Sequence, residues 1–183
     1  MVSPKISIVI PSYNKVKYIK KTLDSIIDQN YKNFEVIIQD GGSTDGSLEV
    51  IKKYVKKYPS LMSYVSKKDG GQLDAINTGI KKAKGEIVTF INADDVYTKD
   101  AFESVAGHYM ENPDALWFAG RGVVIDENDN EIAKPVTWYK SLLLGLNSYH
   151  LLLVTNYHMQ PSVFLTKRAF KKYGLFTGTK FAV

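Results

Sequence analysis

Hydrophobic residues follow two different periods along the first half of the chain. Short runs rich in isoleucine, valine and phenylalanine are typical of buried β-strands, and they occupy residues 6–10, 34–39, 61–66 and 86–91. Between them, apolar residues recur with the spacing of amphipathic helices, over residues 16–29, 45–58, 72–84 and 98–110. This alternation predicts βαβ units and a mostly parallel sheet. We expect Pro11 to end the first strand.

The rhythm changes after Pro113. Two short apolar runs, at residues 116–120 and 122–125, are followed by the turn-rich residues 126–130. This pattern indicates antiparallel strands and a hairpin. The sequence contains no internal repeat, low-complexity tract or linker-like stretch, so we expect residues 1–183 to form a single domain.

Composition narrows the function classes. The chain has 183 residues, of which 44% are hydrophobic, enough for one substantial core. Its net charge is +5, and most of its 24 basic residues are lysines, many in doublets typical of a solvated helix face. No aromatic-interleaved basic stripe accompanies this charge, so nucleic acid is not an expected partner. Because cysteine is absent, disulfides and thiolate metal sites are excluded.

Apolar runs in the second half bear on membrane contact. None of them approaches the roughly 20 residues that span a bilayer. The longest, at residues 142–146 and 151–154, are separated by a polar stretch. We interpret them first as core or as a flap over a site, and second as a membrane-surface patch. We therefore expect a cytoplasmic protein, with peripheral contact at the inner face of the membrane as a further hypothesis.

Polar residues follow each of the four expected parallel strands. Ligands of open parallel sheets bind outside the carboxyl ends of the strands, and the corresponding junctions here are residues 11–14, 40–46, 69–72 and 92–95. We expect them to line one crevice. The two Asp-Gly-Gly sequences also suit ordinary turns, and Ser43, Thr44 and Asp45 are candidate caps for the helix that follows.

The adjacent carboxylates of Asp94 and Asp95 are not explained by a turn alone. Adjacent carboxylates repel each other unless a cation or hydrogen bonds offset their charge. Their hard oxygen ligands suit Mg²⁺ or Mn²⁺, which typically bridges to substrate phosphates. The junction therefore predicts a divalent metal site that a diphosphate would complete.

In motif, order and spacing, the four junctions resemble the family 2 glycosyltransferases. The similar segments are residues 8–14, 34–46, 69–79 and 90–95, and the likeness resumes at residues 158–164, with Arg168 and Gly174. The resemblance implies an α/β fold of the A-type glycosyltransferase class, with a Rossmann-like, mostly parallel central sheet flanked by helices and a smaller antiparallel portion in the second half. It also implies a nucleotide-sugar-binding half at residues 1–112 and the start of an acceptor-binding half at residues 113–183.

The resemblance further implies roles for individual residues at the nucleotide. Pro11, Ser12 and Tyr13 would pack against the nucleotide and hydrogen-bond it. Asp40 would accept a hydrogen bond from the base, commonly from N3–H of uracil. Asp69 falls where the family places an acidic residue near the donor.

The segment Asn92, Ala93 and Asp94 stands where the family has its D-x-D motif. Asp94 would ligate the metal, and Ala93 would lie beside the donor. Asn92 replaces the first aspartate, which removes one negative charge but leaves an amide for the ribose, the metal or a metal-bound water. Asp95 would bind the metal or brace the turn.

The implied reaction is metal-dependent transfer of a sugar, with inversion, from a nucleoside-diphosphate sugar such as a UDP-sugar. The acceptor would be a hydroxyl of a sugar or lipid-linked sugar in polysaccharide or glycoconjugate synthesis. The family places its catalytic aspartate shortly after the glycine that matches Gly174, yet no Asp or Glu follows Glu131. We therefore expect an N-terminal fragment whose base lies beyond Val183, with His158 and Gln160 as further candidate site residues.

Other functions remain as alternatives. A donor-binding module without transfer activity would share every junction motif. A sugar nucleotidyltransferase usually has a Gly-x-Gly-x-x-Arg loop where this chain has Pro11 to Asn14, and a Rossmann dehydrogenase requires Gly-x-Gly-x-x-Gly there. A phosphatase-like metal site would use Asp94 and Asp95 but leave Tyr13 and Asp40 unexplained.

Overall fold

The structure, a computed structural model, describes residues 3–146 and 148–178. The chain forms two compact units. The first unit is Met1–Phe118 with Phe164–Val183, and the second unit is Ala119–Val163. In the described part of the chain, no helix has the length and apolar character needed to cross a membrane.

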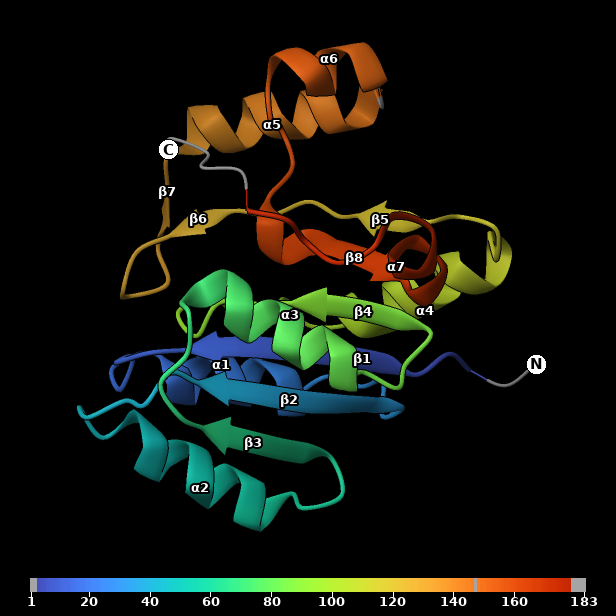
Figure 1. The fold of residues 1–183 in the computed structure, drawn as a ribbon. Helices are drawn as coiled ribbons and strands as arrows, with labels where there is room; N and C mark the ends of the chain where they lie inside the picture. Colours follow the sequence, from blue (N-terminus) through green and yellow to red (C-terminus); the bar gives the residue numbers. More distant parts are fainter. Residues whose placement is uncertain (1–2, 147, 179–183) are drawn as a thin grey trace. The chain divides into compact units, whose positions relative to one another are not determined.

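A six-stranded sheet organises the first unit (Figure 1). Its strands are β1 (Ile6–Ser12), β2 (Phe34–Asp40), β3 (Met62–Ser66), β4 (Ile87–Phe90), β5 (Trp117–Ala119) and β8 (Val163–Thr166). They lie in the order β3-β2-β1-β4-β8-β5, with β1, β2, β3 and β4 parallel and β8 antiparallel to β4. The expected α/β fold with a mostly parallel sheet is confirmed.

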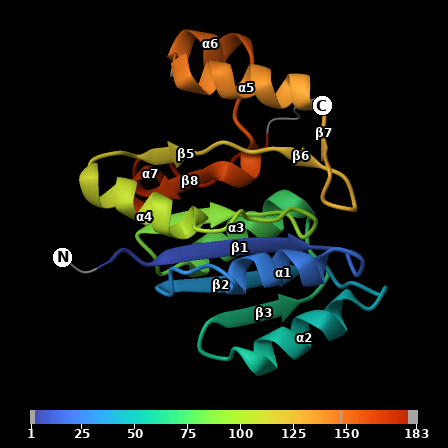
Figure 2. The same ribbon diagram turned by 180° about the vertical axis from the view of Figure 1, so that it is seen from behind.

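Helices cover both faces of this sheet. They are α1 (Ile19–Ile27), α2 (Ser47–Lys57), α3 (Gln72–Lys82), α4 (Ala101–Glu111) and α7 (Lys167–Tyr173). Successive side chains of a strand point to opposite faces, so Ile8 of β1 joins the larger core with α1 and α4, whereas Val9 joins a smaller core with α3 and Phe170 of α7. Figure 2 shows α1 and α4 on one face, and Figure 1 shows α3 on the other.

The first strand does not end at Pro11, as the sequence suggested, but runs through Ser12. The carbonyl of Val9 accepts a hydrogen bond from Ile91 on the β4 side, and the carbonyl of Ser12 accepts one from Gly41 on the β2 side. Because these directions alternate along a strand, the nitrogen of Pro11 faces the β4 side. There the pairing of β1 with β4 has already ended at Val9, so the proline costs the sheet no hydrogen bond.

The second unit contains the expected hairpin. Strand β6 (Val124–Ile125) pairs antiparallel with β7 (Glu131–Ile132). The carboxylate of Asp126 closes the turn by accepting from the amides of Asn128 and Asn130, both at 2.9 Å. The unit also contains α5 (Lys134–Leu146), α6 (Tyr149–Val154) and a 3₁₀ turn at Gln160–Ser162.

A polar clamp fixes the segment after α7 to α3 within the first unit. The side-chain amide of Asn77 donates to the carbonyl of Phe176 at 2.8 Å and accepts from its N–H at 3.1 Å. The ring of Phe176 also packs edge-on against Phe90, with centroids 5.6 Å apart. This segment therefore belongs to the smaller core.

We predict that Gly79→Ala destabilises the fold. An added Cβ at Gly79 would lie 2.3 Å from Cγ1 of Val9, so α3 could no longer approach β1. Overpacking of this kind costs about 1–3 kcal/mol of unfolding free energy. Gly107→Ala in α4 is the matched control, because its Cβ meets nothing within 4 Å, and it should stabilise by about 0.5–1 kcal/mol. Urea unfolding measures both changes, and equal shifts would contradict the packing argument.

Candidate functional site

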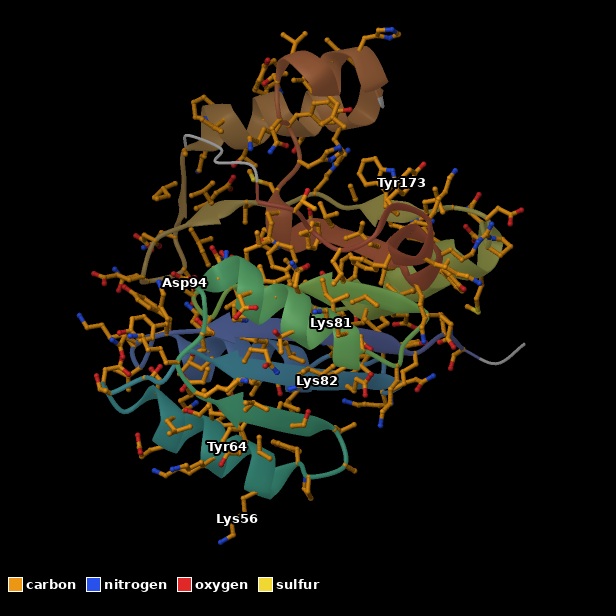
Figure 3. The ribbon with its side chains drawn as sticks, viewed as in Figure 1. Lys56, Tyr64, Lys81, Lys82, Asp94 and Tyr173 are labelled. Carbon is orange, nitrogen blue, oxygen red and sulfur yellow. The ribbon has the colours of Figure 1, made fainter. Side chains whose placement is uncertain are left out.

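A cavity of about 780 Å³ lies in the first unit at the carboxyl ends of the parallel strands. All four polar junctions contribute to its wall. The lining residues are Pro11, Ser12, Tyr13, Lys15, Gly41, Gly42, Lys68, Asp69, Gly71, Gln72, Ala75, Asn92, Ala93 and Asp94. Figure 3 shows Asp94 at the same edge of the sheet as the arrowheads of β1 and β2. The crevice expected from the junctions is therefore present.

Hydrogen bonds tie the loop after β1 to the loop after β2. In each bond, a backbone N–H of one loop meets a side-chain oxygen of the other. The pairs are Asn14 N to Ser43 Oγ (2.9 Å), Thr44 N to Asn14 Oδ1 (3.0 Å), Lys15 N to Ser47 Oγ (2.8 Å) and Val16 N to Asp45 Oδ2 (2.9 Å). These bonds explain why α1 begins only at Ile19 and α2 only at Ser47. Ser43, expected as a helix cap, instead fixes the neighbouring loop, and the N-cap of α2 is Gly46. Asp45 does both, because its Oδ1 also accepts from the amide of Ser47, the first residue of α2, at 2.9 Å.

Asp40 lies beneath the cavity and does not line it. Its side chain is buried, and β1 and β2 pair Ser12 directly with Asp40. Its Oδ2 accepts from the amides of Gly42 (3.2 Å) and Ser43 (3.1 Å) and from Oγ of Ser66 (2.6 Å). Its Oδ1 accepts from Oγ of Ser43 at 2.5 Å. The carboxylate therefore shapes the glycine loop that does line the cavity.

Tyr13, Gly41 and Asp69 form one closely fitted part of the wall. A Cβ added to Gly41 would lie 3.3 Å from Cδ2 of Tyr13 and 3.4 Å from Oδ2 of Asp69. The other carboxylate oxygen of Asp69 accepts from the amide of Gly71 at 2.9 Å. Tyr13 remains 62% exposed, so its ring is available to stack on a planar ligand.

Two oppositely charged residues of the cavity wall, Lys15 and Asp94, form an ion pair. The ammonium of Lys15 lies 2.5 Å from Oδ2 of Asp94, and both side chains are partly exposed. Such a solvent-exposed pair contributes at most about 1 kcal/mol, so it can open when a ligand competes. Nothing in the sequence distinguishes Lys15 or the other cationic wall residue, Lys68, from the many other lysines of this chain.

A chain of amide contacts holds Asn92. Nε2 of Gln72 donates to Oδ1 of Asn92 at 2.6 Å, and Nδ2 of Asn92 donates to Asp95 at 3.1 Å. Asp95 is not among the lining residues. Burial raises the pKa of Asp95, and the charge of Asp94 raises it further, although the hydrogen bond from Asn92 opposes both. In this structure Asp95 thus orients Asn92, which faces the cavity.

The oxygen ligands in the cavity wall suit a divalent cation that is only partly coordinated by the protein. No group of three His, Cys, Asp or Glu side chains that could hold a metal occurs among the described residues. Asp94, however, presents a carboxylate to the cavity and already pairs with the Lys15 ammonium. A divalent cation that takes its other ligands from a diphosphate and water fits this arrangement, whereas an ion coordinated by protein groups alone does not.

Two further candidate residues, His158 and Gln160, belong to the second unit. The ring of His158 lies against Tyr157, with centroids 4.6 Å apart. Burial and the nearby Lys140 ammonium lower the pKa of His158, which favours the neutral imidazole. Gln160 begins the 3₁₀ turn. The catalytic base expected beyond Val183 lies outside the described residues.

The sequence matches a known family model along most of its length. The model is that of glycosyl transferase family 2, and it matches residues 7–174. An uncharacterized glycosyltransferase of Rickettsia typhi is 32% identical over 181 residues, which cover 95% of this chain and 54% of the relative.

Solved structures share the fold. A mannosyltransferase of Pyrobaculum calidifontis, PcManGT, in complex with GDP-Man and Mn²⁺, superposes with a TM-score of 0.70 at 20% identity, covering 97% of this chain and 48% of the other. Residues 1–349 of S. aureus TarS, in complex with UDP-GlcNAc, superpose with a TM-score of 0.64 at 27% identity, covering 92% and 47%. The chain thus spans about half the length of the Rickettsia relative and of these two solved chains.

We predict that Asp40→Ala frees the glycine loop. The carboxylate accepts the amides of Gly42 and Ser43, so its removal should speed hydrogen exchange of both amides by on the order of tenfold or more. Ser66→Ala is the matched control, because it removes one donor to Asp40 and leaves the loop amides bonded. Exchange measured by NMR tests this. Unchanged protection in Asp40→Ala would show that the loop is held by other contacts.

Proposed function

Because the chain belongs to glycosyltransferase family 2, we propose that its first unit binds a nucleoside-diphosphate sugar for transfer of the sugar to an acceptor hydroxyl in glycan synthesis. One observation carries the proposal. A single cavity combines an exposed aromatic ring at Tyr13, two lysines at Lys15 and Lys68, and the carboxylate of Asp94. A base, a diphosphate and a divalent cation require these three kinds of group.

The nucleoside would be held by the loops after β1 and β2. The base stacks on the ring of Tyr13, and Gly41 lets it approach the backbone closely. Asp40 is buried beneath the cavity wall, so it would accept N3–H of uracil only once the glycine loop shifts as the base enters; its Oδ1 receives one protein hydrogen bond, whereas Oδ2 receives three. A carboxylate oxygen has about two lone-pair sites, so Oδ1 keeps one for the base. The complex of TarS with UDP-GlcNAc supports a uridine nucleotide.

The diphosphate would meet three sources of positive charge. Lys15 and Lys68 supply ammonium groups, and α3 directs its first backbone N–H groups from Gln72 toward the same wall. Asp94 would hold Mg²⁺ or Mn²⁺, with Asn92 as a second oxygen ligand or a ligand of a metal-bound water. When bound, the metal stabilises the negative charge of the departing nucleoside diphosphate. The Mn²⁺ in the PcManGT complex supports this choice of cofactor.

Lys15 has a distinct part in this scheme. Its ammonium pairs with Asp94, so an incoming divalent cation and the ammonium compete for the same carboxylate. The released ammonium then lies within the cavity wall, where the diphosphate provides a new partner. Metal and nucleotide therefore bind with positive coupling.

Transfer with inversion needs a base for the acceptor hydroxyl. The lining carboxylates already have partners, since Asp94 pairs with Lys15 and Asp69 accepts the amide of Gly71. We assign deprotonation of a sugar or lipid-linked sugar acceptor to a carboxylate outside the cavity wall. Because both lining carboxylates already have partners, a second candidate function is a donor-binding module without transfer. Transfer of radiolabelled sugar by the full-length protein, set against donor binding alone, distinguishes the two.

We predict that Asp94→Ala abolishes the effect of metal on nucleotide affinity. The unaltered protein should bind UDP at least about tenfold more tightly with Mn²⁺ than with a chelator, and the variant should show no difference, as measured by isothermal titration calorimetry. Glu103→Ala, which removes an exposed carboxylate of α4, should keep the full metal effect. An Asp94→Ala protein that still responds to Mn²⁺ would refute the assignment of the ligand.

We also predict selectivity for the base. Cytosine carries a lone pair at N3 where uracil carries N–H, so the Asp40 carboxylate should repel it. Calorimetry should give an affinity for UDP at least about tenfold higher than for CDP. Asp40→Asn can donate as well as accept, so it should narrow this ratio. Equal affinities of the unaltered protein for UDP and CDP would rule out base reading by Asp40.

A further inference from the structure

The segment that follows α7 runs back along α3 in the first unit. It comprises residues 174–178, and we name it the α7 tail. The side-chain amide of Asn77 on α3 holds its middle, because it donates to the carbonyl of Phe176 at 2.8 Å and accepts from the N–H of the same residue at 3.1 Å. Figure 1 shows the tail leading from α7 toward the edge of the sheet where β1 and β2 end.

Packing and backbone conformation fix the course of the α7 tail. The tail begins at Gly174, whose φ of 83° is in the left-handed region that favours glycine. The ring of Phe176 lies edge-on to Phe90 of β4 and to Phe170 of α7, with centroids 5.6 and 5.9 Å apart. Both partners belong to the smaller core. The amide of Asn77 therefore holds a backbone whose neighbouring ring is already packed.

The far end of the α7 tail reaches the turn of α3 that lines the donor cavity. A Cβ added to Gly178 would lie 3.0 Å from Cδ2 of Leu73. Leu73 follows Gln72 in α3, and Gln72 lines the cavity. The proposed function puts the diphosphate of the donor at this turn, and the transferred sugar is bonded to that diphosphate. The tail therefore ends beside the place where the sugar would lie.

We propose that Asn77 is a positioning residue for sugar transfer. It is not among the residues that line the cavity, so it acts through the backbone that it holds. By fixing the α7 tail on α3, it makes the tail meet the sugar and its acceptor in one defined position, on which the rate of transfer depends. The inference rests on the proposed function. It assigns Asn77 to the rate of transfer and not to the affinity for the donor.

Kinetics of the full-length protein test this assignment. UDP release from UDP-glucose, UDP-galactose and UDP-N-acetylglucosamine is measured with Mn²⁺, and the fastest substrate is used for all variants. Asn77→Ala should lower kcat at least about tenfold and leave KM within about twofold. Calorimetry should give an unchanged affinity for UDP. Hydrogen exchange of the Phe176 amide, measured by NMR, should become at least about tenfold faster, because its acceptor is lost.

Two further variants separate positioning from stability. Asn77→Asp still accepts from the N–H of Phe176 but cannot donate to its carbonyl, so its kcat should lie between those of Asn77→Ala and the unaltered protein. Ile80→Val removes a methyl group from the smaller core, three residues further along α3. It should lower the stability of the fold and leave kcat unchanged. If Asn77→Ala does not fold, Asn77→Asp takes its place in the comparison.

The possible results distinguish this inference from the proposed function. The role of Asn77 is overturned if the Phe176 amide exchanges faster in Asn77→Ala while kcat is unchanged, or if Ile80→Val loses as much kcat. It is also overturned if the full-length protein binds UDP but releases UDP from none of the three sugar nucleotides, a result that leaves donor binding intact. A protein that does not bind UDP at all would refute the proposed function, and the role of Asn77 with it.

Discussion

The parallel pairing of β1 with β2 on one side and β4 on the other is the constraint on which the site depends. It places the ends of these strands at one edge, with Ser12 opposite Asp40. Every residue of β1 is buried, so the strand cannot shift in register without moving its side chains to the wrong face. The junction loops therefore meet in one cavity because of how the strands pair.

Contacts between the loops then determine the shape of that cavity. Asn14 exchanges hydrogen bonds with the loop after β2, and Asp40 holds the glycine loop from below. Glycine at position 41 leaves room between Tyr13 and Asp69. The loops around the cavity are thus tied together by long-range contacts before any ligand arrives, whereas the exposed Lys15 and Asp94 pair is free to rearrange. A site with linked loops and one movable ion pair suits coupled binding of nucleotide and metal.

Local periodicity was enough to predict the alternating strands and helices and the hairpin at Asp126. The predicted ends of elements were wrong where contacts with residues distant in the sequence determine them. Pro11 is tolerated in β1 because β4 stops pairing at Val9, and α2 starts late because Asp45 and Ser47 bond the loop after β1. The tendency of ligands to bind at the carboxyl ends of parallel strands was enough to predict that Tyr13 and Asp94 line the cavity. It could not single out Lys15, whose partner is 79 residues away, or reveal that Asp40 lies behind the wall.

A crystal structure of this chain with UDP and Mn²⁺ tests the central claim most directly, because it locates every proposed contact at once. We predict uracil stacked on Tyr13 with N3–H directed to Asp40, Mn²⁺ bound to Asp94 and to the diphosphate, and the Lys15 ammonium moved from Asp94 to a phosphate oxygen. A nucleotide bound outside this cavity, or Mn²⁺ bound with the Lys15 and Asp94 pair intact, would contradict the account.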